Sequence, residues 1–280
     1  MSRSATGAGV KPIAPTMIAS LPMYLNTIEP LEKLWCYLAP RLASTGGNAV
    51  PQQLVWPTDY AGHWLSPDLL LSQACGFPLV SELAGKVRVV GTFRYRADGC
   101  DGIFCRSKLV VRSHDTANTL ADFRGRTVAY NSTNSQSGYN SLRALVAPLA
   151  QQGKFFGDRV EGGSHRKSVE LVRDGLADIA SIDCVSLAAL EKYSPEVTRG
   201  IRALGYSDPY PGLPLITAAQ TSDAVLASLR SALAQAMHDP ALGATRDALF
   251  IEGFEPVELS AYQVCTTMRD RAYALGCRSL

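Results

Sequence analysis

The first hundred residues carry two hydrophobic patterns, one typical of strands and one typical of helices. The apolar run at 16–25, TMIASLPMYL, predicts a buried strand. Apolar residues spaced three and four apart over 28–44 predict an amphipathic helix whose buried face holds Leu31, Leu34, Trp35 and Leu38. A short strand at 52–57 and a second helix that begins at Ser66, with proline at its first position, follow. This alternating order predicts a parallel sheet.

The same order returns in the second half of the chain. Strands are predicted at 86–95, 102–112, 125–131, 177–183 and 201–207. Helices are predicted at 137–152, 168–174, 184–193, 223–238 and 260–280. The chain therefore contains two α/β units in series, followed by a mainly helical tail long enough to return to the first unit. The chain is expected to cross between the units near residues 110 and 210.

The composition is that of an ordinary globular protein and excludes several classes. Hydrophobic residues make up 46% and charged residues 19%, and the formal net charge is +2. Lys and Arg are scattered, with a small excess at Arg94, Arg96 and Arg106, so nucleic-acid binding is not expected. No run approaches the roughly 18 to 20 apolar residues of a membrane span. The N-terminal stretch lacks the apolar core of a secretory signal, so none is predicted.

The cysteines give no sign of a metal site. The seven are Cys36, Cys75, Cys100, Cys105, Cys184, Cys265 and Cys277, and no two form a C-x-x-C pair. This spacing argues against zinc and against a disulfide framework, and it is compatible with reduced thiols. Cys100 and Cys105 alone are close enough in sequence to suggest a disulfide in an oxidising compartment. No metal and no cofactor are therefore expected.

Strong enzyme signatures are absent from the sequence. It contains no GxxxxGK[ST], no GxGxxG after a strand, no HExxH and no GxSxG. A histidine-dependent mechanism would have only four candidates, His63, His114, His165 and His238. A binding protein is therefore expected rather than an enzyme.

A run of small polar residues at 131–140, NSTNSQSGYN, stands between a predicted strand and a predicted helix. The first turn of a helix offers unpaired N–H donors and a partial positive charge, and serine hydroxyls add further donors. Such a place binds phosphate, phosphonate, sulfate or carboxylate without Lys or Arg. Gly138 fits because backbone close to a ligand leaves no room for a Cβ. The alternative is that Ser135 or Ser137 is a simple helix cap, which contributes about 1 kcal/mol.

Two further polar residues stand at element ends in the second unit. His165 follows GGS directly before an amphipathic helix, where it is either a capping residue or a ligand-binding one. Asp183 ends a predicted strand, at the edge where open α/β sheets bind ligands. Its carboxylate would accept hydrogen bonds from an amine or hydroxyl of a ligand, or it caps the following helix.

Three residues of the first unit are candidates to line a pocket. Asp59 and Tyr60 follow the predicted strand at 52–57, and Tyr24 lies at the end of the first strand. Aromatic and short polar groups at strand ends are typical pocket linings. Tyr24 is equally well explained as a core residue with its hydroxyl at the surface.

Together these segments resemble the phosphonate-type substrate-binding proteins of ABC transporters, the PhnD-like branch of the type II periplasmic-binding-protein fold. The resemblance covers about residues 14–220. It is carried by the serine-rich helix start at 134–140, by GSHRKSVELVRDGLADIASID, by SPDLLLSQACGFPLV and by GCDGIFCRSKLVVR, in that family's order.

The resemblance implies an α/β fold of two lobes, each with a mixed sheet and flanking helices, and a ligand cleft between them. The first lobe would comprise 14–108 and the mainly helical return at 212–280, and the second lobe 109–211. Candidate ligand-binding residues are Ser135, Gln136, Ser137, Gly138, Tyr139, His165, Asp183, Tyr60, Asp59 and Tyr24. The ligand would be a small oxyanion, the partner an ABC permease, and the protein a monomer. Protonation of His165 would tighten anion binding as the pH falls through about 6.5.

Several positions depart from the family's pattern. Gln136 replaces a hydroxyl residue in the serine run, Phe104 and Cys105 replace an aromatic pair of the cleft, and Asp183 replaces a neutral polar residue. The family implies a periplasmic location, whereas the lack of a signal sequence fits the cytoplasm. Two alternatives remain on the same fold: a cytoplasmic enzyme of the menaquinone or thiamine-pyrimidine type, and a ligand-sensing module.

Overall fold

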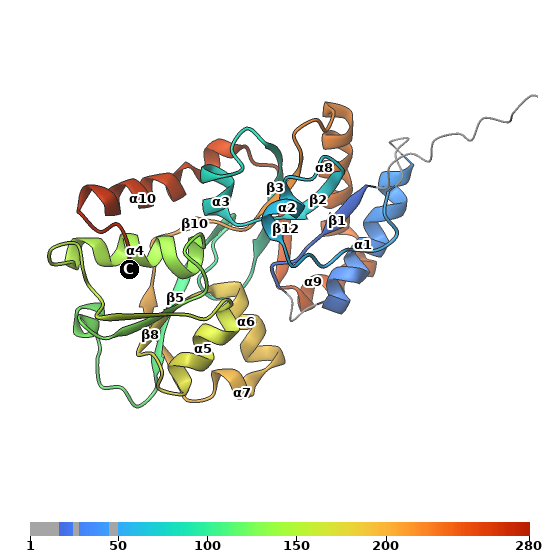
Figure 1. The fold of residues 1–280 in the computed structure, drawn as a ribbon. Coiled ribbons are helices and arrows are strands. Elements are labelled where there is room, and N and C mark those ends of the chain that lie inside the picture. The colour runs from blue at the N-terminus through green and yellow to red at the C-terminus, as the bar shows by residue number, and fades with distance from the viewer. Residues whose placement is uncertain (1–16, 25–27, 45–49) are drawn as a thin grey trace, which may run out of the picture.

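The computed structural model describes residues 17–24, 28–44 and 50–280. Two five-stranded mixed sheets lie side by side, each with helices packed against it (Figure 1). Residues 1–16 of the predicted N-terminal region, together with the ends of the predicted strand at 16–25, lie outside the described residues.

The first sheet combines the two ends of the chain. Its strand order is β1 (Ile18–Ser20), β2 (Leu69–Gln73), β11 (Pro214–Ala218), β3 (Val87–Tyr95) and β12 (Ile251–Glu255). β1 and β2 pair in parallel, whereas β11 is antiparallel to both of its neighbours and β12 is antiparallel to β3. The helices of this part of the fold are α1 (Ile28–Ala43), α2 (Tyr60–Trp64), α3 (Gly76–Ser81), α8 (Asp223–His238) and α9 (Gly243–Ala248), with the 3₁₀ turns η5 (Pro240–Leu242) and η6 (Leu259–Tyr262).

The second sheet is built from the middle of the chain. Its strand order is β7 (Asp158–Glu161), β6 (Thr127–Tyr130), β8 (Ile179–Asp183), β5 (Ser107–Arg112) and β9 (Ile201–Tyr206). β6 is parallel to both β7 and β8, so the carboxyl ends of these three strands meet at one edge. The helices here are η3 (Gln136–Asn140), α4 (Ser141–Val146), α5 (His165–Arg173), α6 (Cys184–Tyr193) and α7 (Pro195–Thr198), with the 3₁₀ turns η2 (Leu120–Phe123) and η4 (Ala147–Leu149).

Two short strands connect the sheets. β4 (Phe104–Cys105) and β10 (Tyr210–Pro211) form a separate antiparallel pair, in which Tyr210 is opposite Cys105. The two crossings predicted near residues 110 and 210 therefore run next to each other. Two adjacent connections between lobes are an arrangement that suits hinge motion.

The C-terminal segment contacts both halves. Strands β11 and β12 belong to the first sheet, but helix α10 (Gln263–Ala274) packs against both α3 and α4 (Figure 1). Beyond it, Cys277 and Leu280 lie in the same apolar core as Leu142 of α4. The return segment at 212–280 therefore carries strands as well as helices, and its end joins the core of the second sheet.

The structure corrects two predicted elements of the first unit. Residues 52–57 form no strand, although Val55 N–H donates to the carbonyl of Ala19 at 2.8 Å. The helix predicted from Ser66 is instead strand β2, because all five residues of LLLSQ are buried between β1 and β11. The sequence pattern of a short apolar run does not distinguish a buried helix from a strand that is buried on both faces. Here the run is a strand because it pairs with neighbouring strands in the sheet.

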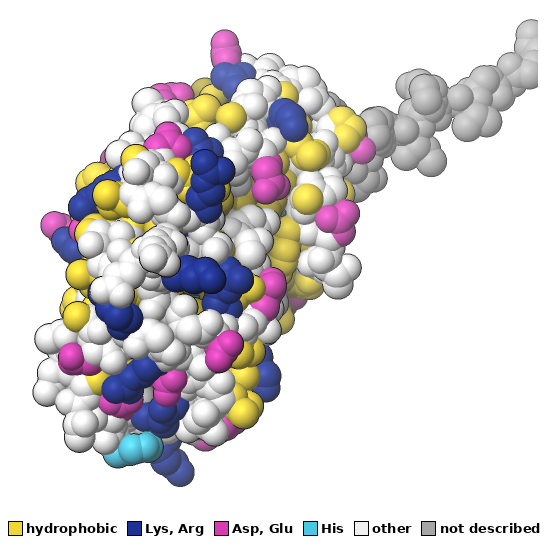
Figure 2. All heavy atoms as spheres, turned by 60° about the vertical axis from the view of Figure 1, so that its left-hand side comes forward, with side chains coloured by type: hydrophobic (Ala, Val, Ile, Leu, Met, Phe, Trp, Pro, Cys, Tyr) yellow, Lys and Arg dark blue, Asp and Glu magenta, His cyan; other side chains and the backbone are white. Residues whose placement is uncertain are grey.

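Helix length and surface charge can be compared with what the composition predicts. Within the described ranges, no helix is long and apolar enough to cross a membrane. On the face that Figure 2 draws, Lys and Arg side chains are interspersed with Asp and Glu. Lys33 and Glu29, 2.7 Å apart, are an exposed pair of this kind.

Candidate functional site

A cavity of about 470 Å³ opens between the two halves of the molecule. This volume lies within the range of small-ligand pockets. The first sheet and its helices contribute Pro22, Met23, Tyr24, Tyr60, Ala61, Trp64, Cys75, Glu82 and Leu213. The second contributes Asn131, Ser132, Asn134, Ser135, Ser137, Gly163, Ser164, His165, Arg166, Asp183, Ser186, Ala189 and Leu190. Six of the ten predicted site residues therefore line one cavity: Tyr24, Tyr60, Ser135, Ser137, His165 and Asp183.

The serine-rich run forms an irregular helix start at the end of β6. Ser135 is the N-cap, and its Oγ accepts the N–H of Gly138 at 3.0 Å. The carbonyl of Ser135 accepts the N–H of Asn140 at 2.9 Å, a five-residue spacing that makes η3 a π-helical turn. Such turns are rare and are often found at functional sites. Ser135 therefore caps the helix, as the alternative interpretation held, and also faces the cavity.

Gly138 allows a close approach between this turn and the end of β6. A Cβ there would lie 2.0 Å from Asn131 Oδ1 and 3.3 Å from the His165 ring. No side chain fits at that distance without displacing the Asn131 amide. Glycine is required here to hold Asn131 and His165 against the turn, although Gly138 itself is not among the residues that line the cavity.

Ser137 is the most strongly fixed residue of the turn. Its carbonyl accepts three hydroxyl hydrogen bonds, from Ser107 at 2.9 Å, Ser141 at 2.9 Å and Ser181 at 2.7 Å. Ser107 Oγ also lies 2.6 Å from the hydroxyl of Tyr210 on β10. These bonds fix the turn against β5, β8 and the connection between the halves, and leave the Ser137 side chain to face His165.

His165 is the first residue of α5, whose N-cap is Ser164. Its Nε2 lies 2.8 Å from Ser137 Oγ. The other nitrogen, Nδ1, is buried and has no hydrogen-bond partner within the described part of the chain. Burial lowers the pKa of His165 to about 4. This corrects the expectation that His165 gains its proton near pH 6.5, because the imidazole is neutral at that pH.

Asp183 ends β8 and caps α6. Its Oδ1 accepts the N–H of Ser186 at 2.8 Å and the hydroxyl of Tyr24 at 3.3 Å. Burial raises the pKa of Asp183 to about 7. The carboxyl is thus a helix cap, as one of the two interpretations held, and it also lines the cavity. Its bond to Tyr24 joins residues 159 positions apart, one from each half.

Of the two candidate residues at the start of α2, Asp59 and Tyr60, only Tyr60 lines the cavity. Tyr60 lines the cavity and stacks on Trp64, with ring centroids 5.7 Å apart and planes at 22°. Asp59 is exposed, caps α2 by accepting the N–H of Gly62 at 3.0 Å, and is not part of the cavity wall. Only the aromatic residue of this pair meets the cavity.

Gln136 and Tyr139 point away from the cavity. Gln136 Nε2 donates to Met268 Sδ at 3.2 Å, and its Oε1 accepts from Asn140 Nδ2 at 2.8 Å. The hydroxyl of Tyr139 accepts the N–H of Leu280 at 3.3 Å, and its ring is buried in the core of the second sheet. Both side chains therefore join η3 to the C-terminal segment rather than to a ligand.

The aromatic positions of the predicted cleft also differ from expectation. Phe104 is 44% exposed and Cys105 is buried, and neither belongs to the cavity wall. They lie on β4, in the connection between the halves. The aromatic lining comes instead from Tyr24, Tyr60 and Trp64.

Two of the lining residues that were not among the ten candidates have polar groups that bear on a ligand. Asn131 stands at the end of β6, and its Oδ1 is buried without a partner among the described residues. Its position at a strand end was the available signal. Arg166 is the single Lys or Arg among the lining residues, and its guanidinium already contacts Glu170 at 3.2 Å and Glu196 at 3.5 Å. The buried polar atoms of the wall that lack a partner among the described residues, Asn131 Oδ1 and His165 Nδ1, belong to neutral side chains.

Two sheets joined by a paired crossover, with a ligand-sized cavity between them, form the architecture of a two-lobed binding protein. The family described as ABC transporter, phosphonate, periplasmic substrate-binding protein matches residues 68–262. The match spans more than half of the chain, so the chain belongs to this family of substrate-binding proteins. The assignment as a binding protein and not an enzyme agrees with the family.

Solved structures show the same fold at low sequence identity. The binding protein component of an ABC phosphonate transporter from Pseudomonas aeruginosa is 17% identical, with a TM-score of 0.74 over 93% of this chain and 88% of that one. PhnD1 from Prochlorococcus marinus, in complex with methylphosphonate, is 16% identical, with a TM-score of 0.73 over 94% and 98%. XAC2383 from Xanthomonas citri, bound to ATP, is 17% identical, with a TM-score of 0.68 over 94% and 98%. No curated protein matches the chain. The fold is thus that of the type II periplasmic binding proteins.

Proposed function

We propose that the cavity binds a small phosphorus oxyanion, a phosphonate or phosphate, and that Ser135, Ser137, Asn131 and His165 surround its oxygens. The observation that carries the proposal is the 2.8 Å contact between Ser137 Oγ and His165 Nε2 in the cavity wall. It brings two helix starts, those of η3 and α5, to one place. Helix starts attract anions because their N–H groups and dipoles point outward.

The hydrogen-bond roles follow from donor counting. A neutral imidazole donates from only one nitrogen. If Nε2–H of His165 donates to Ser137 Oγ, the hydroxyl proton of Ser137 is free to donate to a ligand oxygen. The hydrogen bond from His165 to Ser137 and the one from Ser137 to the ligand then strengthen each other. Ser135 Oγ accepts from Gly138 N–H and keeps its own proton for the ligand. The first N–H of the turn, that of Gln136, already donates to Cys75 Sγ at 3.2 Å, so the hydroxyls supply most of the donors.

The remainder of the ligand would face the opposite wall. Tyr60 and Trp64 offer an apolar surface, which suits the carbon substituent of a phosphonate. Asp183 and Tyr24 offer polar groups that suit an amine or hydroxyl on that substituent. The methylphosphonate bound by the Prochlorococcus relative has a substituent of minimal size and supports the phosphonate class.

Membership of the family indicates which protein partner to expect. A substrate-binding component of an ABC transporter delivers its ligand to a permease, and we propose the same role here. The protein is proposed to act as a monomer that does not bind nucleic acid. The molecular mass from analytical ultracentrifugation, with and without ligand, would test whether the protein is a monomer.

A thermal-shift screen tests the ligand class. The full chain is heated with methylphosphonate, phosphate, sulfate or malate, each over a range of concentrations. Ligands that bind the native state raise the melting temperature by mass action. We expect a rise with the two phosphorus oxyanions and a smaller one, or none, with malate. A rise with malate alone would contradict the proposal.

A further inference from the structure

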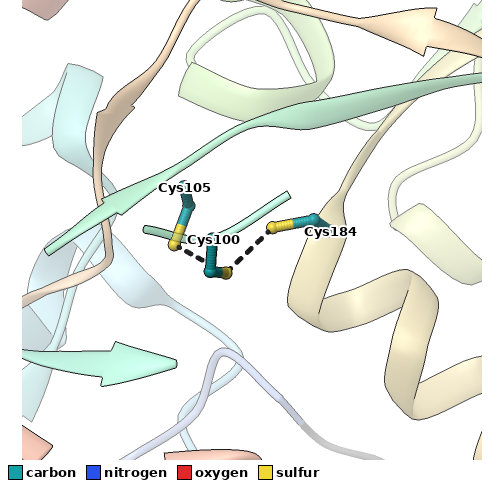
Figure 3. A group of neighbouring side chains, drawn as sticks. All are labelled: Cys100, Cys105 and Cys184. Atoms are coloured by element: carbon teal, nitrogen blue, oxygen red, sulfur yellow. Dashed lines mark hydrogen bonds between the residues drawn. The ribbon is translucent and has the colours of Figure 1, made fainter. Parts of the chain in front are cut away.

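Two cysteines that are five positions apart, Cys100 and Cys105, and the distant Cys184 point toward one another beside the connection between the halves (Figure 3). Cys100 Sγ lies 3.4 Å from Cys105 Sγ and 3.3 Å from Cys184 Sγ. All three sulfurs lie within 4.8 Å of one another. We call these three residues the thiol cluster. Sequence spacing gave no sign of it because Cys184 is brought in by the fold.

The backbone around the thiol cluster is shaped to bring the sulfurs together. Asp101 and Phe104 exchange two backbone hydrogen bonds, of 2.8 and 2.9 Å, and this tight turn sets Cys100 beside Cys105. Gly99 has a φ of +105°, and a Cβ there would lie 3.1 Å from Cys184 Cβ. Glycine therefore allows the turn to approach the start of α6, and substitution would separate the sulfurs.

The distances distinguish the thiol cluster from a disulfide. A disulfide bond is about 2.05 Å long, so all three sulfurs are free thiols here. Sulfurs that share a metal at about 2.3 Å lie roughly 3.8–4.0 Å apart. The separations of 3.4 and 3.3 Å would need to widen by roughly 0.4–0.7 Å, which small χ1 rotations allow.

The donor set indicates the kind of ion. Thiolates select soft cations, chiefly Cu(I) and zinc. Structural zinc takes four ligands. Within the described residues, no His, Asp or Glu joins the three sulfurs as a fourth. Cu(I) is stable with three sulfur ligands.

We propose that Cys100, Cys105 and Cys184 form a binding site for one Cu(I) ion. Binding replaces thiol protons, which pass to solvent, and changes no oxidation state. Cys105 and Cys184 are 2% and 0% exposed, so the ion would be held in a largely dry environment, with access past the half-buried Cys100. The proposal is independent of the oxyanion and differs from the expectation, drawn from cysteine spacing, that the chain has no metal site.

The position suggests a consequence for the lobes. Cys100 follows β3 of the first sheet, whereas Cys184 begins α6 of the second. An ion shared by them would tie the two halves together directly beside Asp183, which lines the cavity.

The test is an anaerobic Cu(I) titration of the reduced full chain against a chromophoric Cu(I) chelator. Cys36 is exposed and would bind the ion by itself, so Cys36→Ser serves as the parent. The variants Cys100→Ser, Cys105→Ser and Cys184→Ser are made in it, with Cys277→Ser as the matched control, a buried thiol outside the thiol cluster. Melting curves show which variants fold.

We expect one Cu(I) per chain in the parent and in Cys277→Ser, with affinity lowered by about tenfold or more in each cluster variant. Equal affinity in all variants would overturn the proposal, and so would tight zinc binding without Cu(I) binding. Because a cluster variant can fail to fold, X-ray absorption of the Cu-loaded parent provides a second measurement. Three sulfur neighbours support the site, and two or fewer overturn it.

Discussion

Ser137 Oγ and His165 Nε2 lie 2.8 Å apart although 28 positions separate them in the chain. They meet because β6 and β7 are parallel neighbours, so the segments that leave their carboxyl ends start two helices at one edge of the second sheet. Open α/β sheets generally bind ligands at the carboxyl ends of their strands. The contact is thus a product of topology, and the cavity wall depends on it.

The Gly138→Ala variant tests the close approach between the turn and Asn131. The added Cβ would lie 2.0 Å from Asn131 Oδ1, so the amide must move out of the cavity wall. We expect a loss of about 1–3 kcal/mol in the free energy of unfolding and weaker binding of the oxyanion. Urea denaturation and titration calorimetry measure the two effects.

Gly243→Ala is the matched control. Gly243 is the first residue of helix α9 and has a φ of −51°, and a Cβ at this position would meet nothing within 4 Å. Alanine should stabilise this position by about 0.5–1 kcal/mol and leave binding unchanged. If Gly138→Ala and Gly243→Ala lost the same amount of unfolding free energy and of binding affinity, the close contact between Gly138 and Asn131 would not be the cause.

The pH dependence of stability tests the environment of His165. Its pKa is about 4 in the folded protein and about 6.5 when unfolded. Between these values the unfolded chain binds a proton that the folded chain does not, so this residue makes stability fall as the pH drops from 6.5 to 4. The loss is on the order of 3 kcal/mol and is complete below pH 4.

The His165→Gln variant removes this contribution. The free energy of unfolding is measured by urea denaturation at pH 7 and at pH 4.5. Its decrease between pH 7 and pH 4.5 should be smaller in the variant than in the wild type. Other titrating groups cancel in this comparison. An identical fall in both proteins would mean that His165 is not held neutral by burial.

The Tyr24→Phe variant tests the hydrogen bond between the halves. The Tyr24 hydroxyl donates to Asp183 Oδ1 at 3.3 Å across the cavity. If ligand binding brings the halves together, loss of this bond should weaken binding by roughly threefold to tenfold, about 1 kcal/mol. Calorimetry with methylphosphonate measures the change.

Tyr95→Phe is the control for that variant. The Tyr95 hydroxyl accepts from Gln73 Nε2 at 3.1 Å, and both residues belong to the first sheet. Its loss should lower stability without changing affinity. If Tyr95→Phe weakens binding as much as Tyr24→Phe does, the contact between the halves has no particular role.

The local parts of the site could be predicted from the sequence. A strand, a polar run and a helix follow one another at 125–152, and this order placed Ser135 and Ser137 at a helix start. His165 and Asp183 were identified in the same way, because each stands where one element ends and the next begins.

The other parts depend on packing that no local pattern records. LLLSQ is a strand because β1 and β11 cover it, and Gln136 turns to Met268, 132 positions away. Cys184 meets Cys100 through the fold alone. Burial, which is not visible in sequence, also decides that His165 is neutral.

The central claim is that the two serine hydroxyls hold the oxyanion, and calorimetric titration of methylphosphonate into the Ser135→Ala/Ser137→Ala variant tests it most directly. Ser222→Ala is the matched control, since Ser222 caps α8 as Ser135 caps η3 and lies outside the cavity wall. We predict single-site binding by the wild type and by Ser222→Ala, and a loss of about 100-fold or more in the double variant. Wild-type affinity in the folded double variant would contradict the account.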